Sequence, residues 1–220
     1  MVGRRRAPEG GLVRFDMFTL RHPGQPRQGD GAVTQQDDGA RDGAAPRILL
    51  DEHIDTDYGQ FDIVYDEDGG FDGDVDRFFA GQVNGLVGAA DPHGVYIHLA
   101  RRYGGSRLKI VLHATAPQVG DEASWEDVVE VSTSVPEDER TEWATWGTAS
   151  DGELHGLRAG DYRVRVSARG RDAADLDQLR GQETDFYLVE LWPAPWAPDS
   201  IIRTTTANAA RWHKTWGGRR

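Results

Sequence analysis

Carboxylates are the side chains with the clearest capacity for chemistry in this 220-residue chain, and they are concentrated in one interval. Eleven lie between residues 51 and 76, where there is no lysine or arginine. Carboxylates can bind hard cations, work in pairs as acid and base, or present a negative surface to a basic partner. This interval is the first place to look for a functional site.

Three interpretations of the interval compete. Asp72, Asp74 and Asp76 supply alternating oxygens of the kind that calcium prefers. The EF-hand pattern is not followed, because Arg77 stands where that loop needs glycine and Val83 where it needs glutamate. The other interpretations are a solvated loop and a negative surface that steers a basic partner. The sequence leaves all three open, including whether a metal site exists.

Tryptophans offer candidate anchors for a partner. Trp143, Trp146 and Trp196 stand in polar or proline-rich surroundings, and each also suits a core position. Trp143 and Trp146 follow a second acidic segment, residues 121–142, in which nine carboxylates face only Arg140. The predicted partner-binding residues are Asp66, Glu67, Asp68, Asp72, Asp74, Asp76, Trp143 and Trp146.

Recognisable catalytic patterns are absent from the sequence. There is no cysteine, no Gly-x-Ser-x-Gly, no phosphate loop and no dinucleotide-binding glycine motif. The seven histidines show no ligand-pair spacing, and His98 and His113 fall opposite an apolar alternation, which predicts a solvated or second face. We therefore expect a protein that is not an enzyme and has no cofactor. A hydrolase with two carboxylates meeting in space stays an alternative.

Charge and hydropathy narrow the partners. The net charge of −12 argues against direct binding of nucleic acid, because a polyanion repels phosphates. No run of about 18 apolar residues is present, so we expect no membrane span. The basic start, Arg4 to Arg6, lacks the apolar segment of a signal peptide, and we expect a cytoplasmic protein.

The elements that must position these residues are strands. Apolar residues alternate with polar ones over 61–65, 95–99, 108–112 and 162–166, a period of two that is typical of half-buried strands. Val128–Val135 is a β-branched run, and Asp185–Trp192 is apolar on both faces, which indicates a central strand. The pattern predicts a mainly β protein, an antiparallel β-sandwich over residues 47–197.

The two ends of the chain differ from this pattern. Residues 1–46 hold too little bulky apolar surface to fold, and we expect a disordered or weakly ordered arm. Residues 198–220 predict a helix that packs on the sandwich, capped by Asp199 and beginning near Ser200. Its apolar stripe includes Trp212 and Trp216.

Several strand motifs together resemble a known family. Gly160-Asp161-Tyr162-Arg163-Val164 opens a strand that is followed by an acidic loop and by Thr184-Asp185-Phe186-Tyr187-Leu188-Val189. Tyr58-Gly59-Gln60-Phe61-Asp62-Ile63 and the stretch Phe79–Leu86 are also similar to segments of the competence protein J family. The likeness runs from about Leu49 to Leu191, with an extra stretch around Gln118–Thr141.

This resemblance implies a non-enzymatic inhibitor, because that family comprises small inhibitors of a DNA-entry nuclease. The expected function is inhibition or immunity-type neutralisation of a basic protein, such as a nuclease, through the acidic surface. The alternative is a small-ligand or carbohydrate-binding β-sandwich, with Trp143, Trp146 and the acidic loops lining a site, with or without calcium.

Overall fold

The computed structural model describes residues 45–66, 68–118, 124–137, 140–146, 150–176 and 184–218. The predicted arm, residues 1–46, lies outside these ranges apart from its last two residues. The elements, in chain order, are β1 (Arg47–Asp57), β2 (Gln60–Val64), α1 (Val75–Phe79), β3 (Val87–Gly88), β4 (Gly94–His98), β5 (Tyr103–Leu112), β6 (Asp127–Val135), β7 (Glu142–Thr145), β8 (Asp151–Glu153), β9 (Gly160–Arg169), α2 (Arg171–Leu176), β10 (Phe186–Pro193), β11 (Ser200–Arg203) and α3 (Ala207–Trp216).

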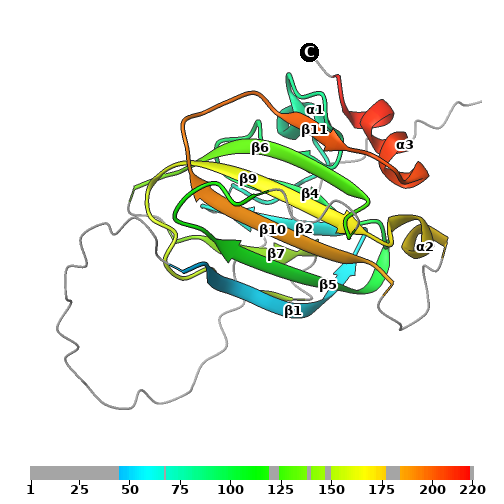
Figure 1. Ribbon diagram of the computed structural model, residues 1–220, viewed down its shortest axis with the longest axis horizontal. Coiled ribbons are helices and arrows are strands. Elements are labelled where there is room, and N and C mark those ends of the chain that lie inside the picture. The colour runs from blue at the N-terminus through cyan, green and yellow to red at the C-terminus, as the bar shows by residue number, and fades with distance from the viewer. Residues whose placement is uncertain are drawn as a thin grey trace, which may run out of the picture. The chain divides into compact units, whose positions relative to one another are not determined.

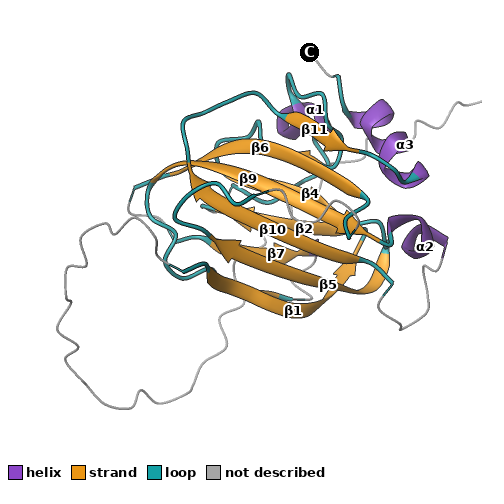
Figure 2. Cartoon of the chain, viewed as in Figure 1, coloured by secondary structure: helices purple, strands orange, loops and turns teal. Residues whose placement is uncertain are grey.

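The strands form two stacked sheets, as the sequence predicts (Figure 1). Sheet A has the order β1-β5-β10-β9-β6-β11, and sheet B has the order β3-β4-β2-β7-β8. The pairs within them are antiparallel except β5 with β10, which run parallel. The mainly β fold with a C-terminal helix is therefore confirmed (Figure 2).

The core lies between the sheets and follows the alternation of the sequence. Ile54, Ile110 and Val164 of sheet A are fully buried, as are Phe61 and Ile63 of sheet B. Burying one such side chain stabilises the fold by roughly 1.5–3 kcal/mol. Residues Val128–Val135 lie in β6, and Phe186–Pro193 form β10, which lies between β5 and β9 as expected of a central strand.

The C-terminal helix starts later than the sequence predicts. Ser200–Arg203 form strand β11, which pairs with β6, and α3 begins at Ala207 with Thr206 as its N-cap. Asp199 does not cap the helix, because its carboxylate accepts hydrogen bonds from the backbone N–H groups of Val83 and Asn84. A long-range anchor thus replaces the local cap.

Aromatic rings cover the outer face of sheet B. Tyr96 of β4 is buried beneath Phe71, Phe78 of α1 and Trp216 of α3. His98, on the same face, is buried as well and packs against Trp212. His98 therefore lies on the face of sheet B opposite the core between the sheets, as predicted, but α3 shields this face from solvent.

A buried polar network joins α2 and α3 to both sheets. The Arg171 guanidinium donates to the carbonyl oxygen of His98 and to Asn208 Oδ1, and it lies 4.0 Å from the Asp127 carboxylate. Burial, and the charge of Arg171 beside it, lower the pKa of His98 well below its ordinary value, so the ring is neutral near pH 7. These contacts fix the helices on the sandwich.

Candidate functional site

The predicted carboxylates lie on one surface segment that runs from the end of β2 into the first turn of α1, where Asp76 lies. Within it, Asp68, Asp72, Asp74 and Asp76 are exposed and Asp66 is half-buried. Glu67 lies outside the described residues. We call Asp66, Asp68, Asp72, Asp74 and Asp76 the acidic loop; they include every predicted carboxylate that the structure describes.

Backbone hydrogen bonds hold part of this loop in shape. Asp66 Oδ1 accepts from the N–H of Asp68 at 2.9 Å, and Asp72 Oδ1 accepts from the N–H of Asp74 at 2.9 Å. Asp74 is the N-cap of α1, because its Oδ1 accepts from the N–H of Arg77 at 3.0 Å. These turns keep the carboxylates in place before any partner arrives.

Two basic side chains, His93 and Arg77, contact carboxylates of the acidic loop. His93 Nδ1 lies 2.5 Å from Asp66 Oδ2, and this hydrogen bond raises the pKa of His93 above its ordinary value. Arg77 lies 3.3 Å from Asp72 and 2.6 Å from the buried Asp91. Partial burial by itself would raise the pKa of Asp72. The N–H of Asp74 and the Arg77 guanidinium outweigh this effect and hold the pKa of Asp72 below its usual range.

The two predicted tryptophans have different positions. Trp143 of β7 is only 6% exposed and stacks on Phe61 at 5.7 Å between ring centroids, so it belongs to the core. Trp146, just after β7, is 42% exposed. The structure thus leaves Trp146 exposed, as a partner anchor requires, and places Trp143 in the core, which is the alternative position that the sequence allowed.

Trp146 is part of an exposed aromatic cluster that the sequence analysis missed. Tyr58, which is 52% exposed, lies 5.7 Å from both Trp146 and Tyr103 between ring centroids. The guanidinium of Arg102 lies 4.8 Å above the ring of Tyr58. We call Tyr58, Arg102, Tyr103 and Trp146 the aromatic cluster. The Tyr58-Gly59 pair between two strands was the available signal, since both residues adopt positive φ in the β1–β2 turn.

The aromatic cluster and the Asp72 end of the acidic loop both approach the start of β2, whereas Asp66, beside His93, lies toward the other end of that strand. Thr145 pairs with Phe61, so the register brings Trp146 alongside the start of the same strand. Gln60, at that start, donates from Nε2 to the carbonyl oxygen of Phe71 at 2.9 Å, and Phe71 precedes Asp72. The fold therefore brings Trp146 and the Asp72 end of the loop to one end of sheet B.

The remaining carboxylates of the acidic interval do not join this loop. Asp51 lies on β1 and pairs with Arg107 and Lys109 of β5, in sheet A. Asp62 of β2 is buried. In the second acidic segment, Asp127 is buried and Glu130 pairs with arginines of β9. The negative surface is consequently smaller than the sequence count suggests.

Metal binding has limited support in the loop. No group of three or more His, Asp or Glu residues that could hold an ion occurs within the ranges that the structure describes. Asp72 and Asp74, which were candidate calcium ligands, accept hydrogen bonds from backbone N–H groups instead. Likewise, none of the described helices is long and apolar enough to cross a membrane.

Comparisons with known proteins give two similar structures. No family model matches the chain, and no curated protein matches it either. ComJ from Bacillus subtilis, an inhibitor of the DNA degrading activity of NucA, has a TM-score of 0.48 and 16% identity over 69% of this chain and 100% of ComJ. The crocagin biosynthetic gene J product has a TM-score of 0.40 and 13% identity over 68% of this chain and 99% of its own. At these scores and identities the likeness identifies neither a family nor a partner.

Proposed function

We propose that this protein is a non-enzymatic binding protein that neutralises a basic protein partner through the acidic loop and the aromatic cluster. One observation carries the proposal: exposed Trp146 and Tyr58 lie at the end of β2 that the Asp72 end of the acidic loop also reaches. Interfaces are commonly anchored by Trp, Tyr and Arg at their centre, with charged residues around them.

The two parts have separate tasks in binding. Exposed carboxylates such as Asp68 attract a positive surface over a distance, which raises the association rate. The rings of Tyr58 and Trp146 already pack edge to face, so little side-chain entropy is lost when a partner covers them. Their burial would then set the dissociation rate.

The partner that we propose is a DNA nuclease, as the sequence resemblance implies. A nuclease that binds DNA presents cationic groups to phosphates, and fixed carboxylates can occupy the same groups. The protein would block DNA entry sterically and electrostatically, without chemistry of its own. No cofactor is needed for this action.

The direct test is inhibition of a DNA-entry nuclease from the same genome. The purified nuclease degrades plasmid DNA with and without an equimolar amount of this protein in 50–150 mM salt. We expect inhibition by the unaltered protein, and inhibition at least about tenfold weaker for Trp146→Ala, because truncating an anchor typically costs 2 kcal/mol or more.

A charge-matched control separates specific from general electrostatics. Asp68→Asn with Asp76→Asn removes two charges from the acidic loop, and Glu52→Gln with Asp161→Asn removes two from sheet A, where both are exposed. Only the loop pair should slow association. Full nuclease activity with excess protein, or equal effects of the two pairs, would reject the proposal.

A further inference from the structure

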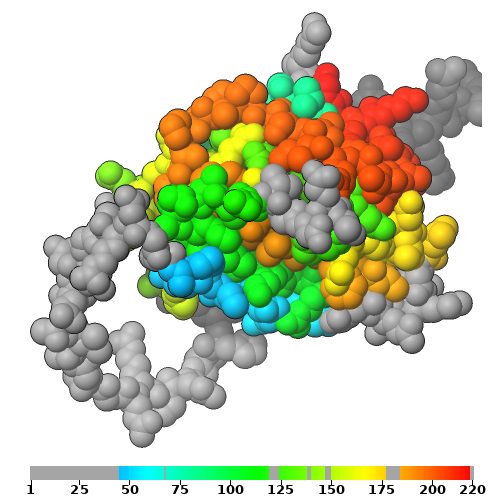
Figure 3. All heavy atoms as spheres, viewed as in Figure 1, coloured from blue at the N-terminus to red at the C-terminus, as the bar shows by residue number. Residues whose placement is uncertain are grey.

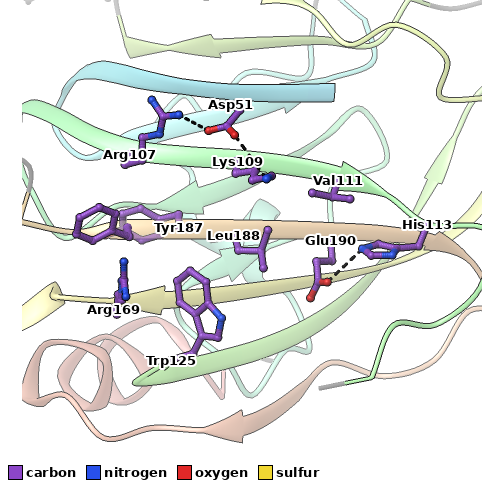
Figure 4. A pocket seen from close by; sticks show the side chains of 11 residues that line it. Asp51, Arg107, Lys109, Val111, His113, Trp125, Arg169, Tyr187, Leu188 and Glu190 are labelled. Atoms are coloured by element: carbon purple, nitrogen blue, oxygen red, sulfur yellow. Dashed lines mark hydrogen bonds and ion pairs between the residues drawn. The ribbon is translucent and has the colours of Figure 1, made fainter. Parts of the chain in front are cut away.

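The outer face of sheet A carries a hollow that the proposed function does not use. It has a volume of about 410 Å³ and lies over β5 and β10, on the sheet that does not contain the acidic loop (Figure 4). The face belongs to strands β1, β5, β10 and β9, which lie side by side in Figure 1, and Figure 3 shows the same side of the molecule in space-filling form. A hollow of this size suits a small molecule.

The strand register places two arginines on either side of one ring. Phe186 of β10 pairs with Arg107 of β5 and with Arg169 of β9, so the three residues form a row across the sheet. Two residues further along both strands, and therefore on the same face of the sheet, Lys109 pairs with Leu188. The hollow therefore has an apolar floor and basic side chains at its sides, and the carboxylates of Asp51 and Glu190 also belong to its lining.

Arg169 differs from the other cations of this face. Arg107 and Lys109 both pair with Asp51. Arg169 has no carboxylate partner within the described residues; its guanidinium lies 4.4 Å from the centre of the Phe186 ring and 5.7 Å from that of Trp125. Stacking restrains the guanidinium and leaves its N–H edge available to an oxyanion.

We propose that this hollow binds a small ligand that has a planar ring and one anionic group. The ring would pack on Leu188 and against the Trp125 indole, and the anion would accept hydrogen bonds from Arg169. This chemistry follows from the lining: two aromatic walls, an aliphatic floor and a restrained arginine, in a chain whose net charge of −12 otherwise repels anions. A phosphate or a carboxylate could supply the charge.

Two probes distinguish the sources of the anion. Binding of adenosine monophosphate and of indole-3-acetate is measured by calorimetry and by amide chemical shifts of the full chain in low salt, with adenosine as the neutral control. We expect at least one of the two anions to bind at least about tenfold more tightly than adenosine, with shifts centred on residues 107–111, 167–169 and 186–190.

Matched variants locate the site. Arg169→Gln keeps a long polar side chain at an exposed position, and we expect it to weaken anion binding about tenfold or more, as loss of a charge-assisted hydrogen bond does. Arg158→Gln removes the same charge from an exposed residue just before the other end of β9 and should leave binding unchanged. Absence of binding by both anions, or equal weakening by the two variants, would overturn the proposal. Trp146→Ala should not affect anion binding. The test of the hollow is therefore independent of the test of the proposed function.

Discussion

Asp62 illustrates how much one residue depends on what covers it. The alternation of β2 points its side chain away from the core between the sheets, yet it is only 2% exposed. Gln60 Nε2 donates to Asp62 Oδ2 at 2.5 Å, and Asp62 Oδ1 has no hydrogen-bond partner in the described part of the chain. Burial raises the pKa of Asp62 from 3.8 to about 7.

This raised pKa predicts a specific pH dependence of stability. The folded state keeps the proton up to about pH 7, whereas the unfolded state loses it near pH 4, so stability falls as pH rises through this window. Asp62→Asn removes the penalty. We expect the stabilisation by this variant, measured by urea denaturation, to be about 2–3 kcal/mol larger at pH 8 than at pH 5.

Asp68→Asn is the matched control, because Asp68 is exposed and lies in the segment that follows β2. Its free energy of unfolding should differ from that of the unaltered protein by the same small amount at both pH values. A pH-independent effect of Asp62→Asn would contradict the assignment of a buried, protonated carboxyl.

The two tryptophans of the predicted site should respond differently to truncation. Trp143→Ala empties a core position stacked on Phe61 and should lower the free energy of unfolding by about 3–5 kcal/mol. Trp146→Ala changes an exposed residue and should lower it by less than about 1.5 kcal/mol. Chemical denaturation of the two variants side by side checks this, and similar losses would show that Trp146 is structural.

At the scale of elements, α3 is held by its first turn as much as by its apolar stripe. Thr206 Oγ1 accepts from the N–H of Ala209 at 3.1 Å and also hydrogen-bonds to Asp127 Oδ2. Asp127 is buried and lies near Arg171, so the cap connects the helix to the polar network. The helix cap and the hydrogen bond to Asp127 thus meet at the Thr206 hydroxyl.

Thr206→Ala should therefore cost more than loss of an ordinary cap. We expect the free energy of unfolding to fall by about 2–3 kcal/mol, since both the cap and a hydrogen bond to a buried carboxylate are lost. Thr215→Ala, at an exposed position of the same helix, should be neutral within about 0.5 kcal/mol. Equal losses in thermal or urea unfolding would show that the cap is not coupled to the network.

At the scale of the whole molecule, the acidic loop and the basic residues of the hollow lie on different sheets. The acidic loop follows β2 of sheet B, whereas Arg107, Lys109 and Arg169 lie on sheet A. The proposed partner should consequently be steered to one side only. We expect its association rate to fall severalfold between 50 and 300 mM salt, with little change in the dissociation rate. Stopped-flow or surface-binding kinetics would test this; a salt-independent association rate would contradict steering.

The sequence by itself determined the strands and their inward faces. A period of two leaves no other way to bury Phe61, Ile63 and Ile110 together, and the structure confirms this. It also indicated Trp146 as either a core residue or an anchor, and the structure places it at the surface. The cytoplasmic location and the disordered arm remain predictions.

Only the tertiary structure decided which polar residues share a surface. Asp51, Asp62 and Asp72 are close in sequence, yet one pairs with arginine on sheet A, one is buried, and one is exposed. The C-terminal helix start was likewise decided by distant partners, because Asp199 finds backbone N–H groups of residues 83 and 84. Local pattern fixes which face a residue occupies on its strand, but strand order and the packing of helices set its neighbours, and these depend on contacts across the whole chain.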